Sequence, residues 1–265
     1  MLAARAAPYR IDTLAGAIDG VGSPGHRGRG FHFANVTIAP GARVIVSGEL
    51  PLVLLATGSV TVAGDLVGDG QAGADARLAS GGAAGRGGPG GAAGGRGGGT
   101  VPGHGRAAGE RGRGSGGGHR GAFTPNPLGP AAVEVGGGAS HATKGEDAAF
   151  EPRTVGGPPY GSALISPLAG GSGGGGGGIR DVEDIGQPGN GGGGAGGAIL
   201  LQARGQIAVG GTAVVTATGG PGGVTSMTSM PRPGGNGGDG RIRFEDGDGS
   251  IAAGGTAATG VLPLP

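Results

Sequence analysis

Four carboxylates near the C-terminal end are the side chains whose chemistry is easiest to name. Asp239, Glu245, Asp246 and Asp248 stand close together in a glycine-rich stretch of the chain. Carboxylate oxygens on a pliable loop suit Ca²⁺, a hard cation that takes oxygen ligands. The spacing therefore indicates a candidate calcium site, and no other cofactor is expected. The alternative interpretation is a solvated acidic turn between two strands.

Signatures of catalysis are weaker than this acidic cluster. The stretch from Gly170 to Gly174 formally matches G-x-S-x-G around Ser172. A nucleophile elbow needs a helix after the serine, and only glycines follow here. The five histidines, His32 among them, have no partner at metal-ligand spacing, and the chain has no cysteine to complete a site. We expect the histidines to be exposed loop residues and the protein not to be an enzyme.

Arginine within the glycine-rich region suggests a different chemistry, contact with nucleic acid. Arg86 and Arg96 begin RGG triplets, and further arginines follow as far as Arg120. Arginine contacts phosphate and stacks on bases, so such segments bind RNA. Aromatic residues are nearly absent from this stretch, and the whole chain carries a net charge of only +1. We therefore expect no nucleic acid partner, and an RGG-type RNA-binding protein remains the alternative function.

The composition limits the folds that could position any of these residues. Glycine accounts for 75 of the 265 residues, against a usual frequency of about 7%. The absence of cysteine excludes a disulfide framework and a cysteine nucleophile. No stretch approaches the roughly 20 apolar residues of a membrane-spanning helix, so no membrane span is expected. A chain of this kind must fold largely through its backbone.

An internal repeat is the strongest indication of architecture. Residues 51–67 and 198–214 align without gaps, and leucine, alanine, glycine and valine recur at matching places. A shorter copy begins at Val44, upstream of the related run at Val60, and a further copy covers residues 249–257. Each copy reads as a short strand, a glycine corner and the start of the next strand. A unit this short cannot bury its own apolar face, whereas stacked copies can.

This reasoning predicts an all-β fold, a short right-handed parallel β-solenoid interrupted by glycine-rich polyglycine-II-like strands. A small irregular β-sandwich is the alternative. The expected organisation is a weakly structured lead-in (1–35), first coils (36–67), a glycine-rich insertion (68–197), later coils with a short glycine-rich insertion (198–257) and a tail (258–265). The alternating inward positions give the expected core: Val44, Val46, Leu52, Leu54, Val60, Val62, Ile199, Leu201, Ile207, Val209 and Ile251.

The glycine-rich insertion contains a periodicity of its own. Glycine recurs at every third residue in the series Gly82, Gly85, Gly88, Gly91, Gly94 and Gly97. A polyproline-II-type helix has three residues per turn, so this spacing leaves one bare stripe along it. Bare stripes allow several such strands to pack closely through backbone contacts. The pattern predicts ordered strands of this kind, with a flexible insertion as the alternative and collagen disfavoured because proline is scarce.

The ordered set of strings resembles a known group of proteins. The segments at residues 50–66, 160–178 and 191–212, joined by glycine-rich stretches, are similar to the glycine-rich β-solenoid secreted or surface proteins encoded by myxobacteria and their relatives. The resemblance covers about residues 36 to 257. It implies a cell-envelope or extracellular β-solenoid protein with polyglycine-II-like insertions.

Together these features predict a non-enzymatic structural or adhesive component of a bacterial cell surface, extracellular matrix or tail-like assembly. The expected location is extracellular or at the cell surface, although residues 1–10 show no apolar signal-peptide core. The expected partner is an envelope, matrix or host-surface ligand. A homo-oligomer is also expected, because an exposed last coil could pair end to end.

Overall fold

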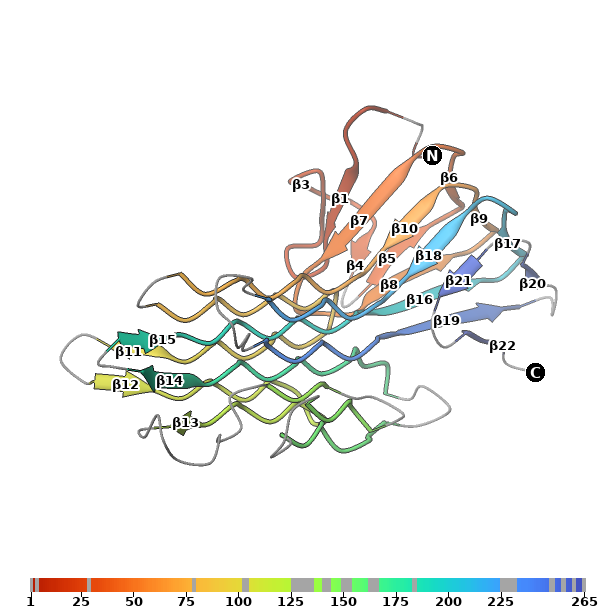
Figure 1. The fold of residues 1–265 in the computed structure, drawn as a ribbon. Coiled ribbons are helices and arrows are strands. Elements are labelled where there is room, and N and C mark those ends of the chain that lie inside the picture. Colours follow the sequence, from red (N-terminus) through yellow and green to blue (C-terminus); the bar gives the residue numbers. More distant parts are fainter. Residues whose placement is uncertain are drawn as a thin grey trace.

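The computed structural model of the chain consists of strands and extended glycine-rich segments (Figure 1). It describes residues 2, 5–27, 30–77, 80–101, 105–124, 136–139, 144–148, 154–161, 167–182, 185–224, 233–247, 251–253, 256–258 and 261–263. These residues contain no helix. The described part accordingly has no helix able to cross a membrane.

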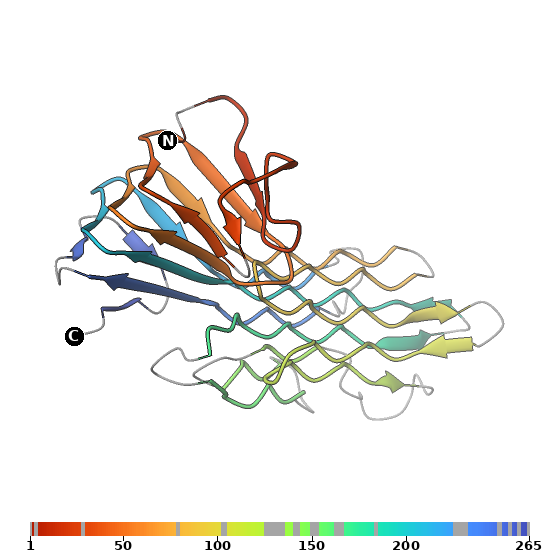
Figure 2. The ribbon, with the colours of Figure 1, turned by 180° about the vertical axis from the view of Figure 1, so that it is seen from behind.

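Three multi-stranded sheets form one end of the molecule (Figures 1 and 2). The largest has the order β21 (Thr256–Ala258), β18 (Val214–Thr216), β10 (Asp65–Val67), β7 (Arg43–Ser47), β1 (Tyr9–Asp12), β2 (Ala17–Ile18) and β3 (Val21–Gly22). The second has the order β22 (Val261–Pro263), β19 (Arg241–Asp246), β16 (Ala198–Ala203), β8 (Leu52–Ala56), β5 (Gly30–Phe33) and β4 (His26–Arg27). The third has the order β20 (Ile251–Ala253), β17 (Ile207–Val209), β9 (Val60–Val62) and β6 (Val36–Ile38).

Two smaller sheets lie in the glycine-rich region. One pairs β11 (Gly99–Val101) with β12 (Gly105–Ala107), and the other has the order β13 (Phe123–Thr124), β14 (Ile179–Val182) and β15 (Ile185–Gln187).

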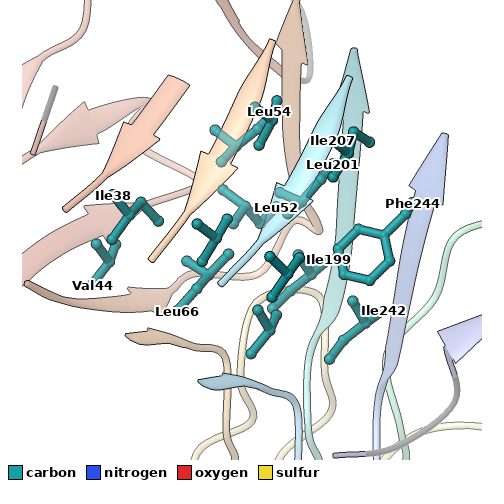
Figure 3. Packing of buried hydrophobic residues seen from close by; sticks show 14 of the residues in the cluster. Ile38, Val44, Leu52, Leu54, Leu66, Ile199, Leu201, Ile207, Ile242 and Phe244 are labelled. Atoms are coloured by element: carbon teal, nitrogen blue, oxygen red, sulfur yellow. The ribbon is translucent and has the colours of Figure 1, made fainter. Parts of the chain in front are cut away.

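The inward faces of the three large sheets share one hydrophobic core (Figure 3). Alternate residues of β8 and β16 are buried, as expected for strands with one covered face. Ten of the predicted core residues are buried in this cluster, and Ile251 is partly buried against it. The sequence analysis did not identify its two largest members, Phe31 and Phe244, which are each 1% exposed.

Residues 9–33, predicted to belong to a weakly structured lead-in, instead carry β1 to β5. Their turns use positive backbone φ angles, at Gly16 (63°), Asp19 (52°) and Gly20 (78°). Asp12 supports the same region, because its Oδ1 accepts hydrogen bonds from the backbone N–H groups of Leu14 and Ala15, both at 2.9 Å. These turns fold β2 and β3 back antiparallel, and β4 likewise pairs antiparallel with β5.

The predicted fold class is therefore wrong. In place of an all-β short right-handed parallel β-solenoid interrupted by polyglycine-II-like strands, the described residues form three multi-stranded sheets, two mixed and one parallel. The physical reason lies at the N-terminal side, where hairpin turns add antiparallel strands that the repeat did not encode. The glycine-rich segments pair with one another in a large bundle.

That bundle, here called the glycine bundle, runs out from the sheets as extended segments lying side by side (Figures 1 and 2). Residues 189–197 lie at its centre. Their backbone N–H groups donate to residues 68–74, 92–98 and 235–238 at 2.8 or 2.9 Å. Their carbonyl groups accept from residues 82–88, 171–177 and 220–223. One extended segment is thus hydrogen-bonded to six others, and partners on each side recur every third residue.

Residues 171–177 form a second central segment with the same arrangement. Its N–H groups donate to residues 110–113, 190–196 and Gly137, and its carbonyls accept from residues 92–98, 118–121 and 235–238. All residues from Gly170 to Gly178 are buried. With neighbours packed around the segment, the only side chain that it accommodates is that of Ser172, and the other residues from 170 to 178 are all glycine.

Candidate functional site

The outer face of the six-stranded sheet carries the residues best placed to bind a ligand. In the parallel register of β5, β8, β16 and β19, His32 pairs with Leu55, Leu55 with Gln202, and Gln202 with Glu245. The residues that precede them along the strands, Phe31, Leu54, Leu201 and Phe244, are buried in the core, so these four point outward. We call this row of four residues the outer rung.

A hollow of about 870 Å³ lies over the outer rung and the carboxyl ends of the same four strands. Its walls combine polar groups with apolar ones. The lining residues include His32, Phe33, Leu55, Gln202, Arg243, Glu245 and Ile251, together with Arg204 and Asp246 at the strand ends. His32 and Gln202 are exposed, whereas Leu55 is half-buried. The volume lies within the range of about 300–1,000 Å³ typical of ligand pockets.

An ion pair lies in the wall of this hollow. Arg243 Nη2 is 2.6 Å from Glu245 Oε1, and the two side chains are 21% and 24% exposed. Both belong to β19 and point outward, because they are two residues apart in a strand. Asp246 Oδ2 accepts a long hydrogen bond of 3.5 Å from the Ile207 backbone N–H. The two arginines and two acids of the hollow, Arg204 and Arg243 with Glu245 and Asp246, balance in charge.

Of the predicted calcium ligands that the structure describes, Asp239 lies in a different part of the fold from Glu245 and Asp246. Asp239 lies in the glycine bundle, where its Oδ1 accepts the backbone N–H of Gly219 at 2.9 Å. Glu245 is paired with Arg243, and Asp246 lies at the end of β19. Asp248 lies outside the described residues. Among the residues that the structure describes, no group of three or more metal-ligating side chains is found.

The glycine stripe faces the interior of the bundle. A Cβ added at Gly82, Gly85, Gly88, Gly94 or Gly97 would overlap a backbone carbonyl of a neighbouring segment, for example the Gln71 oxygen at Gly85. At Gly91 the added atom would come within 2.7 Å of the Gly196 oxygen. Each position therefore depends on glycine for close approach of two backbones, not for an unusual φ angle.

Polar side chains also complete the hydrogen bonding of the bundle, and none of these residues was predicted from the sequence. Asp69 Oδ1 accepts the Thr218 N–H and Asp75 Oδ1 accepts the Val224 N–H, both at 2.8 Å. Asn236 Oδ1 accepts the Gly222 N–H at 3.0 Å. The buried Asn190 does the same for Ala76 at 2.8 Å. Their signal in the sequence is a lone Asp or Asn inside a glycine run.

The serine of the G-x-S-x-G match belongs to this framework. Ser172 is 0% exposed, and its Oγ accepts the Gly116 backbone N–H at 3.0 Å. Beside it, Tyr160 Oη donates to the Gly170 carbonyl at 2.8 Å. Burial raises the pKa of Tyr160, while its hydrogen bond with Ser172 lowers it to a smaller extent. Burial also lowers the pKa of the nearby Arg241 guanidinium. These groups join the bundle to the start of β19.

The arginines of the RGG stretch lie on the outside of the bundle. Arg86, Arg96 and Arg120 are exposed. A single acidic residue, Glu110, lies among them in the sequence, and its segment pairs with the one bearing Arg96. The Glu110 Oε2 also accepts the Arg96 backbone N–H at 3.4 Å.

Comparison of the chain with protein families, with curated proteins and with solved structures gives no match.

Proposed function

We propose that this protein is a non-enzymatic structural and adhesive component of a bacterial cell surface, extracellular matrix or tail-like assembly. The observation that carries the proposal is the pairing of residues 189–197 with six neighbouring segments. Unfolding the bundle would break many backbone hydrogen bonds at once, so local opening is unfavourable. Such a bundle suits a protein that must keep its shape outside the cell.

The adhesive part of the proposal is supported by how the molecule divides its roles. In its described part the glycine bundle packs backbone against backbone and exposes arginines on its outside, whereas the outer face of the six-stranded sheet carries a hollow with mixed polar and apolar walls. A stiff bundle attached to a binding face suits a component that holds a ligand at a surface. RNA binding by the RGG stretch receives less support, because aromatic residues are nearly absent from the stretch and the net charge of the whole chain is only +1.

The test is labelling of the protein on intact host cells. The chain has no cysteine, so a single introduced thiol reports only its own position. Ala83 is exposed on the bundle and Ala198 is 0% exposed in β16. We expect Ala83→Cys to react with a membrane-impermeant maleimide on intact cells or in the medium, and Ala198→Cys to react only after denaturation. Labelling of Ala83→Cys only after lysis would contradict the proposal.

A further inference from the structure

We propose that the hollow over the outer rung binds a neutral glycan chain that lies across strands β5, β8, β16 and β19. This inference deepens the proposed adhesive function and rests on it, because it names the class of ligand that the surface component would hold.

The spacing of the outer rung is the first argument. Neighbouring strands lie about 4.8 Å apart, so the four residues from His32 to Glu245 cover about 14 Å in a straight row. The register is fixed by the parallel pairing of all four strands. A linear ligand laid across the strands would meet one outer-rung side chain on each strand that it crosses, which suits a polymer with a regular repeat.

The chemistry of the walls is the second argument. Sugar hydroxyl groups both donate and accept hydrogen bonds, so they are matched by groups that offer both functions. The Gln202 amide provides a donor and an acceptor, and the His32 ring has a nitrogen of each kind when neutral. Leu55 adds apolar surface in the outer rung itself, and Phe33 and Ile251, which also pack against the core, line the same hollow. Such surface can cover the C–H faces of a sugar ring while the polar groups bind its edge.

The charge of the hollow selects a neutral ligand. Arg243 and Glu245 already compensate each other at 2.6 Å, and the remaining two charged residues of the lining, Arg204 and Asp246, have opposite signs. A polyanion such as a nucleic acid or an acidic polysaccharide gains its affinity from uncompensated positive charge. The charged residues that line this hollow carry no net positive charge, although they can still hydrogen-bond to hydroxyl groups.

The backbone argues against an added peptide strand at the same place. Both edges of β8 and both edges of β16 are already hydrogen-bonded to other strands. β8 lies between β5 and β16, and β16 lies between β8 and β19. Binding by strand addition requires an open sheet edge, which the floor of the hollow does not provide. The ligand must therefore be recognised by side chains.

The test uses the purified full chain and hexamers of β-1,4-linked glucose, β-1,4-linked N-acetylglucosamine and α-1,4-linked glucose. We expect calorimetry to detect binding of at least one of them. Gln202→Ala and His32→Ala should each weaken that binding by about fivefold to tenfold, the loss expected for one hydrogen bond. Gln206→Ala is the matched control, because Gln206 is exposed but does not line the hollow, and it should leave the affinity unchanged. Equal unfolding midpoints would show that all three variants fold.

Oligouridylate and oligogalacturonate serve as charged probes of the same hollow. Failure of all three neutral hexamers to bind, binding unchanged by Gln202→Ala and His32→Ala, or stronger binding of a charged probe would each overturn the inference. The labelling of Ala83→Cys is measured independently. Surface labelling without glycan binding would overturn this inference alone, whereas glycan binding by a protein labelled only after lysis would overturn the proposed surface role.

Discussion

Asp69 and Thr218 are joined by a hydrogen bond across 149 positions of the chain, from the Thr218 backbone N–H to Asp69 Oδ1 at 2.8 Å. Asp75 and Val224 repeat this contact at the same separation. Between them, Gly70 and Gly73 donate backbone hydrogen bonds to Thr218 and Pro221. The aspartates thus add side-chain acceptors to the backbone hydrogen bonds that join these two segments.

Removing this acceptor should destabilise the bundle. We expect Asp69→Ala to lower the free energy of unfolding by about 1–3 kcal/mol, because the part-buried Thr218 N–H loses its partner. Asp69→Asn keeps an acceptor oxygen and should cost less. Urea unfolding of the three proteins measures the difference. Equal stabilities for Asp69→Ala and the parent chain would show that water replaces the carboxylate without loss.

A methyl group at the centre of the bundle should be far more damaging than one in β3, the last strand of the seven-stranded sheet. At Gly193 an added Cβ would overlap the Gly220 carbonyl oxygen, whereas at Gly22 it meets no heavy atom within 4 Å. We expect Gly193→Ala to cost about 3 kcal/mol or more, since both partners are backbone and neither can rotate away. Gly22→Ala should change stability little. Similar unfolding midpoints for the two variants would contradict the six-neighbour packing.

The core of the sheets offers a matched pair of leucines on one strand. Leu201 is 0% exposed in the shared core, while Leu200 is half-buried on the outer face of β16. We expect Leu201→Ala to cost about 3–5 kcal/mol through lost burial and a residual cavity. Leu200→Ala should cost about 1 kcal/mol. Denaturant unfolding would decide, and a larger loss at Leu200 would mean that the faces of β16 are assigned the wrong way round.

Tyr160 should make the protein sensitive to alkali. Because burial raises its pKa above the ordinary 10.0, the folded state holds the phenol proton more tightly than the unfolded state does. The stability from this group is therefore complete below about pH 10 and is lost as the pH rises from there towards the raised pKa. Thermal unfolding from pH 8 to 11 should show this loss, and Tyr160→Phe should reduce it. An identical alkaline slope in Tyr160→Phe would assign the effect to other groups.

Leu52 and Ile199 show what a sequence repeat can predict. The gapless alignment places them at equivalent positions, and they are neighbours in adjacent strands, as are Val60 and Ile207. The pairing of β10 with β18 departs from this alignment, because Asp65 lies opposite Val214, whereas the alignment matches Val67 to Val214. The shift is by an even number of residues, so Leu66 and Val215 still point inward. A gapless comparison cannot register extra residues in a corner.

The short copy at Val44 was matched to Val60, yet β7 pairs with β10, so Val44 lies beside Leu66. Strings of valine and glycine are too alike to identify the partner. The positions of Gln202 and His32 in the hollow were equally hidden, since an outward position on a strand accepts almost any polar residue. Only the register of four distant strands brings them together.

The arrangement around residues 189–197 also has a mechanical consequence. A β-sheet holds its strands together within a single plane, and it flexes readily out of that plane. In the glycine bundle, the N–H and carbonyl groups of one segment reach six others arranged around it. The resistance to shear between neighbours is therefore distributed around the whole cross-section, so the bundle behaves as a rod with no soft bending direction.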